Sequence, residues 1–132
     1  MDQSSKTILL IEDEEDIRIV YAEVLRDAGY RVIEAKDGNM GLERAVAGDW
    51  DLMLLDIMLP GMDGLQIVKK TKGDIGLQNK PVILLTNLGN ESIIAEGFDM
   101  GAEGYLIKSE ITPDKIVQEV EDSFKKKTNP NV

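Results

Sequence analysis

Five short apolar runs recur along the chain, and segments with helical periodicity separate them. The runs are TILLI at 7–11, YRVIEA at 30–35, DLMLLD at 51–56, PVILLT at 81–86 and GYLIK at 104–108. Most are continuous rather than alternating, which is typical of strands buried on both faces of a parallel sheet. Because strands that alternate with helices imply right-handed crossovers, we predict an α/β fold of the (βα)5 type. Such a fold is a doubly wound, three-layer sandwich around a five-stranded parallel sheet.

The segments between the runs carry the sequence features of helices. The apolar residues of 14–29 fall on one stripe at helical spacing, and the acidic residues at its start suit the positive end of the helix dipole. Asp37, Asp63 and Thr112 stand where a side-chain oxygen can cap the first turn of the following helix. The predicted helices are 14–29, Asp37 to about Ala47, 64–72, roughly 91–100, and a last one that begins at Thr112.

Length and composition indicate one globular unit. The chain has 132 residues, of which 42% are hydrophobic and 30% charged. We expect a single domain over 1–132, with its core at about 6–126 and with 127–132 as a tail or a linker stub. The sequence contains no cysteine and no histidine. Disulfides, thiolate metal sites and a phosphohistidine on this chain are therefore excluded.

The formal net charge of −10 limits the partners of the chain. Nucleic-acid backbones and anionic membrane surfaces attract clustered lysine and arginine, so we expect no direct contact with nucleic acid or membrane. The apolar runs are too short to span a bilayer, and the N-terminal sequence MDQSSKT lacks the apolar core of a secretory signal. We expect a cytoplasmic protein.

Polar residues follow four of the five apolar runs. Glu12 and Asp13 follow the first run, Asp56 ends the third, Thr86 ends the fourth and Lys108 ends the fifth. Each alone has an ordinary explanation, such as a helix cap, a turn residue or a solvated edge. However, ligands of open α/β sheets bind beyond the carboxyl ends of the strands. We therefore expect these side chains to meet at one edge of the sheet.

Three carboxylates beside one lysine leave excess negative charge at that edge. Two like charges about 4 Å apart repel by roughly 4 kcal/mol at an effective dielectric constant of about 20. Either a carboxyl pKa rises or a divalent cation binds, and an all-oxygen ligand set suits Mg2+. With Mg2+ bound, Asp56 can act as a nucleophile toward a phosphoryl group, while Lys108 and Thr86 contact the phosphoryl oxygens.

Several motifs resemble those of one family and occur in the same order. They are ILLIEDE, DGNMGLE, DLMLLDIMLPGMDG, ILLTN, GAEGYLIKS and ITPDKIVQEV. Together they resemble the receiver domain of two-component response regulators, similar to the chemotaxis regulators, over about residues 6–126. The resemblance implies a flavodoxin-like sheet with strand order 2-1-3-4-5.

The resemblance also implies a role for each residue of the acidic edge. Asp56 would accept a phosphoryl group from a phosphohistidine on a sensor histidine kinase or phosphotransfer protein. Asp13 and Asp56 would bind Mg2+ directly, together with the backbone carbonyl of Met58, and Glu12 would bind it through water. Lys108 would contact the phosphoryl oxygens.

A conformational switch is implied as well. Thr86 would close on the phosphoryl group, and Tyr105 would then turn inward. The output surface for a downstream protein target would comprise the helix at 91–100, the strand at 104–108 and the last helix. The resemblance implies a signalling switch rather than an enzyme, acting as a monomer or as a phosphorylation-dependent homodimer.

The sequence departs from the family pattern beside the proposed site. Ser109 follows the lysine where the family usually has proline, so we expect a trans peptide bond there. Asn87 stands where a small residue is common, and it could narrow access to the site or contact the phosphoryl group. Met58 and Leu88 are apolar and flank the expected path of attacking water. We therefore predict slow autodephosphorylation.

Three other functions fit parts of the pattern. A Mg2+-dependent phosphatase would need an acid/base partner and a cap over its substrate, and the chain offers no histidine and no long insertion. An FMN-binding module would bind phosphate after the first strand, where the acidic run EDEED would repel it. A receiver-like scaffold that binds partners without phosphorylation remains open.

Overall fold

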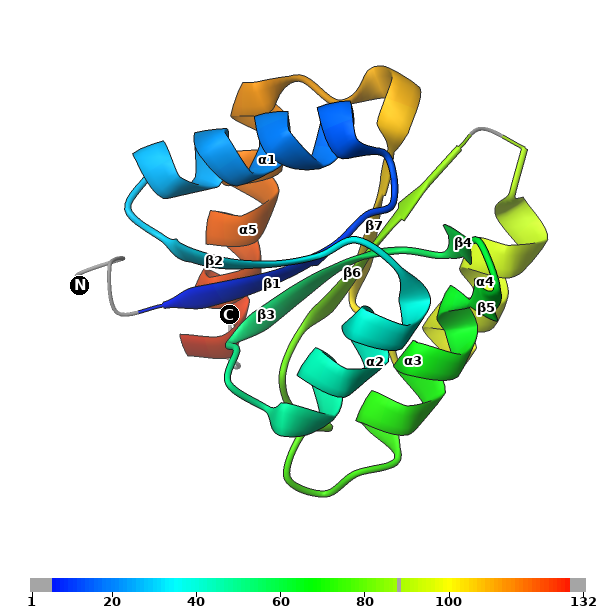
Figure 1. The fold of residues 1–132 in the computed structure, drawn as a ribbon. Coiled ribbons are helices and arrows are strands. Elements are labelled where there is room, and N and C mark those ends of the chain that lie inside the picture. The colour runs from blue at the N-terminus through cyan, green and yellow to red at the C-terminus, as the bar shows by residue number, and fades with distance from the viewer. Residues whose placement is uncertain (1–5, 88, 129–132) are drawn as a thin grey trace.

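Five parallel strands form the central sheet of the computed structural model, which describes residues 6–87 and 89–128 (Figure 1). The strands lie in the order β2-β1-β3-β6-β7. In chain order this is 2-1-3-4-5, so the predicted topology is confirmed. The strands are β1 (Thr7–Ile11), β2 (Arg31–Ala35), β3 (Leu52–Asp56), β6 (Val82–Thr86) and β7 (Gly104–Ile107).

Helices cover both faces of this sheet, which gives the predicted three layers (Figure 1). One face carries α1 (Glu15–Asp27) and α5 (Pro113–Thr128), and the other carries α2 (Gly38–Ala47), α3 (Gly64–Lys72) and α4 (Glu91–Asp99). Because β3 and β6 lie inside the sheet, every residue of both strands is buried. This burial explains why their sequences are continuous rather than alternating. No helix in the described part of the chain is long and apolar enough to cross a membrane.

Several of the predicted helix ends have the expected caps. Asp37 accepts a hydrogen bond from the Met40 N–H, and α2 ends at Gly48, whose φ of 76° is left-handed. Asp63 caps α3, but it accepts from the Leu65 N–H rather than from the position that a capping box uses. These caps fix the residues at which α2 begins and ends and the residue at which α3 begins.

A small hairpin was not predicted. The two-residue strands β4 (Met58–Leu59) and β5 (Met62–Asp63) pair antiparallel directly after β3. Gly61 forms the turn between them with a φ of 74°. This hairpin fixes the course of the chain between β3 and α3.

The segment after β7 continues as a short 3-10 helix, Lys108–Glu110. No cis peptide bond occurs among the described residues, so the Lys108–Ser109 bond is trans as expected. The 3-10 turn leads into α5, where the Lys115 N–H lies 3.4 Å from the capping hydroxyl of Thr112.

Candidate acidic site at the carboxyl ends of the strands

The structure brings the acidic residues of two strands together. One carboxylate oxygen each from Glu12, Asp13 and Asp56 lies within 4.8 Å of the others. Glu12 and Asp13 follow β1, and Asp56 ends the neighbouring strand β3. Glu12 and Asp56 are buried, whereas Asp13 is partly exposed. As expected from the positions of these residues at the carboxyl ends of parallel strands, their side chains lie close together.

Lys108 joins the two buried carboxylates. Its ammonium lies 2.7 Å from Asp56 Oδ2 and 2.8 Å from Glu12 Oε1, and only 6% of its side chain is exposed. The same ammonium lies 3.4 Å from Glu14 Oε1 at the rim. One buried cation thus balances part of the negative charge of this edge.

Backbone groups hold the remaining carboxylate oxygens. Asp56 Oδ1 accepts a hydrogen bond from the Met58 N–H at 2.9 Å, and Glu12 Oε2 accepts one from the Glu14 N–H at 3.0 Å. Met58 is the first residue of β4, two residues after Asp56, and Glu14 is the N-cap of α1, two residues after Glu12. The two carboxylates are therefore oriented before any ligand arrives.

Burial and ion pairing shift the pKa values of Glu12, Asp56 and Lys108. Burial is the main reason that the pKa of Glu12 rises to about 7, and it also raises the pKa of Asp56 above its ordinary value. Burial alone would lower the pKa of Lys108, but its contacts with Asp56 and Glu12 outweigh burial and raise it. The ionised carboxylates are thus costly in this site, and added positive charge would stabilise them.

Thr86 ends β6 next to this cluster. The register pairs Asp56 with Leu85, so Thr86 lies one residue further along the adjacent strand. Its hydroxyl donates to the Asn87 carbonyl at 3.3 Å and accepts from the Asn90 side-chain amide at 3.0 Å. Among the described residues no hydrogen bond joins the Thr86 hydroxyl to the carboxylates.

Asn90 is a residue that sequence reasoning missed. It stands at the N-cap of α4 without a side-chain capping bond, and its amide N–H donates to the Thr86 hydroxyl. An asparagine four residues after the strand-end threonine was the available indication. The contact connects the hydroxyl of Thr86 to the start of α4.

Arg18 was also missed. Its guanidinium donates to the Glu12 carbonyl at 3.0 Å and to Glu34 Oε1 at 3.2 Å, and Arg26 pairs with the other Glu34 oxygen at 3.1 Å. Only 12% of the Arg18 side chain is exposed. Its position as the first cation after the EDEED run was the available indication. The network fixes the loop that carries Glu12 and Asp13.

Tyr105 and Met58 are two further predicted residues that the structure describes. Tyr105 is 45% exposed and meets Phe98 of α4 edge to face, with ring centroids 6.0 Å apart. Met58 is 52% exposed beside Asp56. Leu88 lies outside the described residues, so its predicted position beside the site is not tested.

The donor set fits a divalent cation. Three carboxylates offer oxygen ligands, as Mg2+ prefers. Glu12 Oε1 is buried against the Lys108 ammonium at 2.8 Å, and a carboxylate oxygen has a second lone pair that can accept a hydrogen bond from a metal-bound water. The excess negative charge would be reduced by such an ion.

A family model for the response regulator receiver domain matches residues 8–121. The chain belongs to the response regulator receiver family. Receiver domains are the phosphorylation-dependent switches of two-component signalling rather than metabolic enzymes, and they bind Mg2+ in an acidic pocket.

Curated relatives of this receiver are longer proteins. It is 32% identical over 121 residues to the transcriptional regulatory protein ResD of Bacillus subtilis, covering 91% of this chain and 49% of that protein. It is 34% identical over 116 residues to the transcriptional regulatory protein SrrA of Staphylococcus aureus, covering 88% of this chain and 46% of that protein. The receiver thus spans about half the length of these relatives.

Solved structures of similar length share the fold. The chemotaxis response regulator CheY4 of Vibrio cholerae is 28% identical with a TM-score of 0.81, covering 89% of this receiver and 97% of that chain. A CheY-like receiver domain from Methanospirillum hungatei has a TM-score of 0.87, covering 96% of this receiver and 98% of that chain. Its identity is 22%, so this second likeness concerns the fold alone.

Proposed function

We propose that Asp56 accepts a phosphoryl group from a phosphohistidine on a partner histidine kinase or phosphotransfer protein, and that one receiver domain with its core at about 6–126 responds as a switch. The observation that carries this proposal is the setting of Asp56. Its carboxylate ends a buried strand, yet it is oriented by the Met58 N–H and lies 2.7 Å from the Lys108 ammonium. A carboxylate with this arrangement is positioned to act as a nucleophile.

In the proposed step, an Asp56 oxygen attacks phosphorus and the bond between phosphorus and the histidine nitrogen breaks. The electron pair of that bond leaves with the imidazole, and the new bond makes an aspartyl phosphate. Lys108 can stabilise the negative charge on the phosphoryl oxygens, because its ammonium already lies beside Asp56 and Glu12. Thr86 offers a hydroxyl to a phosphoryl oxygen once it leaves its present partners.

Mg2+ would be held directly by Asp13, Asp56 and the backbone carbonyl of Met58, and through water by Glu12. When bound, it supplies positive charge that phosphoryl transfer needs. The raised pKa values of Glu12 and Asp56 support this assignment, since both carboxylates gain from a nearby cation.

The proposed switch starts at Thr86. A phosphoryl group adds about −1.5 to −2 charges and strong hydrogen-bond acceptors. To donate to a phosphoryl oxygen, the Thr86 hydroxyl must leave the Asn87 carbonyl, and rotation of this side chain would disturb the bond that it accepts from Asn90 at the start of α4. Movement of α4 would allow Tyr105 to leave its outward position against Phe98, which belongs to this helix. The output surface is then the face formed by α4, β7 and α5, and its partner is a downstream protein.

The lifetime of the aspartyl phosphate should be long. Met58 exposes an apolar side chain beside Asp56, and Asn87 follows Thr86. Met58 and Leu88 are apolar and neither orient nor easily admit an attacking water, and Asn87 could narrow access to Asp56 or contact the phosphoryl group. Replacing Met58 and Leu88 together by polar residues should therefore speed phosphate loss.

The proposal is tested by incubation with a small phosphoryl donor, with Mg2+ or with EDTA, followed by intact mass measurement. We expect one phosphoryl group per chain in Mg2+ and none in EDTA. Asp56→Asn should remove the label, whereas Asp37→Asn, which keeps an N-cap residue on α2, should not. Full binding of a partner by unlabelled Asp56→Ala protein would instead support the scaffold function.

A further inference from the structure

A groove separates α3 from α4 next to the acidic site. Its volume is about 400 Å3, and its apolar lining comes from Ile57, Met58, Leu59, Leu65 and Ile93. Met58 is 52% exposed, so an apolar side chain stays in contact with water at one end of the groove. Methionine adapts its shape to different partners, which suits a docking surface.

The polar residues that line this groove carry only negative charge. They are Asp63 at the N-cap of α3 and Glu96 on α4. Within the described residues neither carboxylate forms an ion pair. One oxygen of Asp63 accepts from the Leu65 N–H, which leaves its other oxygen available. An apolar groove with two uncompensated carboxylates is complementary to a cation on an apolar stem.

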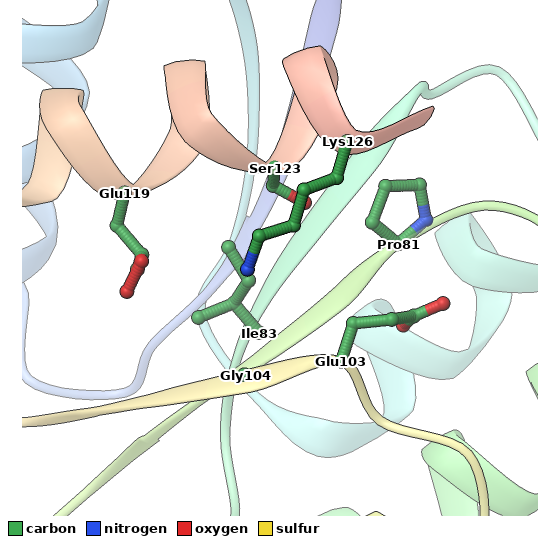
Figure 2. A pocket seen from close by; sticks show the side chains of 7 residues that line it. All are labelled: Pro81, Ile83, Glu103, Gly104, Glu119, Ser123 and Lys126. Atoms are coloured by element: carbon green, nitrogen blue, oxygen red, sulfur yellow. The ribbon is translucent and has the colours of Figure 1, made fainter. Parts of the chain in front are cut away.

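A second pocket gives a useful contrast (Figure 2). It has a volume of about 340 Å3 and lies between α5 and the start of β7. Its lining includes both signs of charge, and Figure 2 shows the Lys126 side chain extending from α5 over it. Glu103 of this pocket already pairs with Lys72 at 2.8 Å. The second pocket is therefore much less complementary to a cation than the groove is.

We propose that the groove between α3 and α4 binds a segment of a partner protein that presents an arginine beside an apolar side chain. The apolar side chain would lie against Met58 and Ile93, and the guanidinium would reach Glu96 and Asp63. Arginine fits better than lysine, because its planar head can bind carboxylates through two parallel hydrogen bonds while its stem covers apolar surface. This groove shares α4 with the proposed output face but includes neither β7 nor α5, and the proposal does not depend on phosphorylation.

The test uses the dipeptide acetyl-Leu-Arg-amide and the unphosphorylated full chain. Methyl NMR signals of isoleucine and methionine are followed during titration. We expect saturable shifts at Ile57, Met58 and Ile93 but not at Ile83, which lines the second pocket. The matched acetyl-Leu-citrulline-amide has the same shape without the charge, and it should bind about threefold more weakly.

Two conservative variants locate the charge effect. Glu96→Gln and Asp63→Asn, which keeps a capping side chain on α3, should each reduce the preference for arginine over citrulline. Glu119→Gln in the second pocket should leave it unchanged. The proposal is overturned if arginine and citrulline peptides bind equally, if the largest shifts fall at Ile83, or if no saturable shift occurs.

Discussion

Asp56 shows how one residue can favour function over stability. Burial is the largest cause of its raised pKa, so the folded state disfavours the ionised carboxylate. The folded-state pKa lies above the unfolded one, and ionisation at neutral pH therefore lowers the stability of the fold. Lys108 offsets part of this cost, but its ammonium is shared because it also pairs with Glu12.

We predict that Asp56→Asn stabilises the protein without Mg2+ at neutral pH. The amide removes a buried charge, and Lys108 can still pair with Glu12. The free energy of unfolding in urea should rise by about 1 kcal/mol, or roughly 2–4 °C in Tm. The variant Asp37→Asn, at a partly exposed helix cap, serves as the control. A clear loss of stability in Asp56→Asn would show that the pair with Lys108 outweighs the burial of charge.

Tyr30 gives a prediction in alkaline solution. Burial is the main reason that its pKa rises to about 12, with the nearby Glu121 as a second cause. The unfolded phenol ionises near pH 10, so between about pH 10 and 12 the unfolded state has lost a proton that the folded state keeps. Stability should therefore fall through this window, by up to about 2–3 kcal/mol. A Tyr30→Phe variant compared with the wild type by urea denaturation isolates this effect, and equal pH dependence of the two would refute it.

The sequence predicted residues whose position follows from topology, and it missed those whose role follows from tertiary contacts. Glu12, Asp56 and Lys108 end or follow strands, so the parallel sheet alone brings them together. Asn90 looks like an ordinary helix cap, and its bond to Thr86 depends on the path of the loop between them. Arg18 looks like a solvated helix residue until α1 is placed beside β2.

At the scale of elements, α3 approaches the end of β3 through Gly64. A Cβ atom built at this position would lie 2.5 Å from the Ile57 Cα and 2.8 Å from the Asp56 carbonyl oxygen. Both neighbours are backbone atoms that cannot move without shifting the loop after Asp56. The glycine is therefore required by close approach of the two elements.

We predict that Gly64→Ala lowers the free energy of unfolding by about 1–3 kcal/mol. Helix propensity alone favours alanine, so the sign of the change separates steric crowding from propensity. Gly76→Ala, where the nearest atom is 3.3 Å away on the Asp74 side chain, is the control and should change stability by less than about 0.5 kcal/mol. Equal stability of Gly64→Ala and the wild type would contradict the close approach.

Elements with clear periodicity were predicted within a few residues, whereas the hairpin of β4 and β5 was not. Each of its strands has two residues, which is too short for any alternating pattern. Strand β2 was predicted from residue 30 and begins at Arg31, because Tyr30 turns into the core beside Phe124. Such boundaries depend on packing that the sequence does not display.

On the scale of the whole molecule, the two ends of the sheet differ in their side chains and in their proposed roles. The carboxyl end gathers the acidic site, while the other end is held by ordinary structural contacts. Trp50 lies at that other end, with its indole N–H donating to the Ala45 carbonyl and the Lys80 ammonium 5.5 Å from its ring. About six residues of strand, or roughly 20 Å, separate it from Asp56.

This separation predicts that Mg2+ leaves the fluorescence of Trp50 nearly unchanged. The indole is buried and lies at the end of β3 opposite to the proposed metal ligands. Titration of the emission with Mg2+ checks this, with Asp13→Asn as a control for metal binding. Strong quenching that saturates with the metal in the wild type but not in Asp13→Asn would contradict the proposed location.

The central claim is that Asp56 becomes an aspartyl phosphate. The most direct measurement treats the Mg2+-dependent labelled protein with borohydride, which reduces an aspartyl phosphate to homoserine, and then maps the peptides by mass spectrometry. The account predicts homoserine at position 56 and at no other aspartate. Conversion at Asp13 instead, or none at position 56 in protein that carries the label, would contradict it.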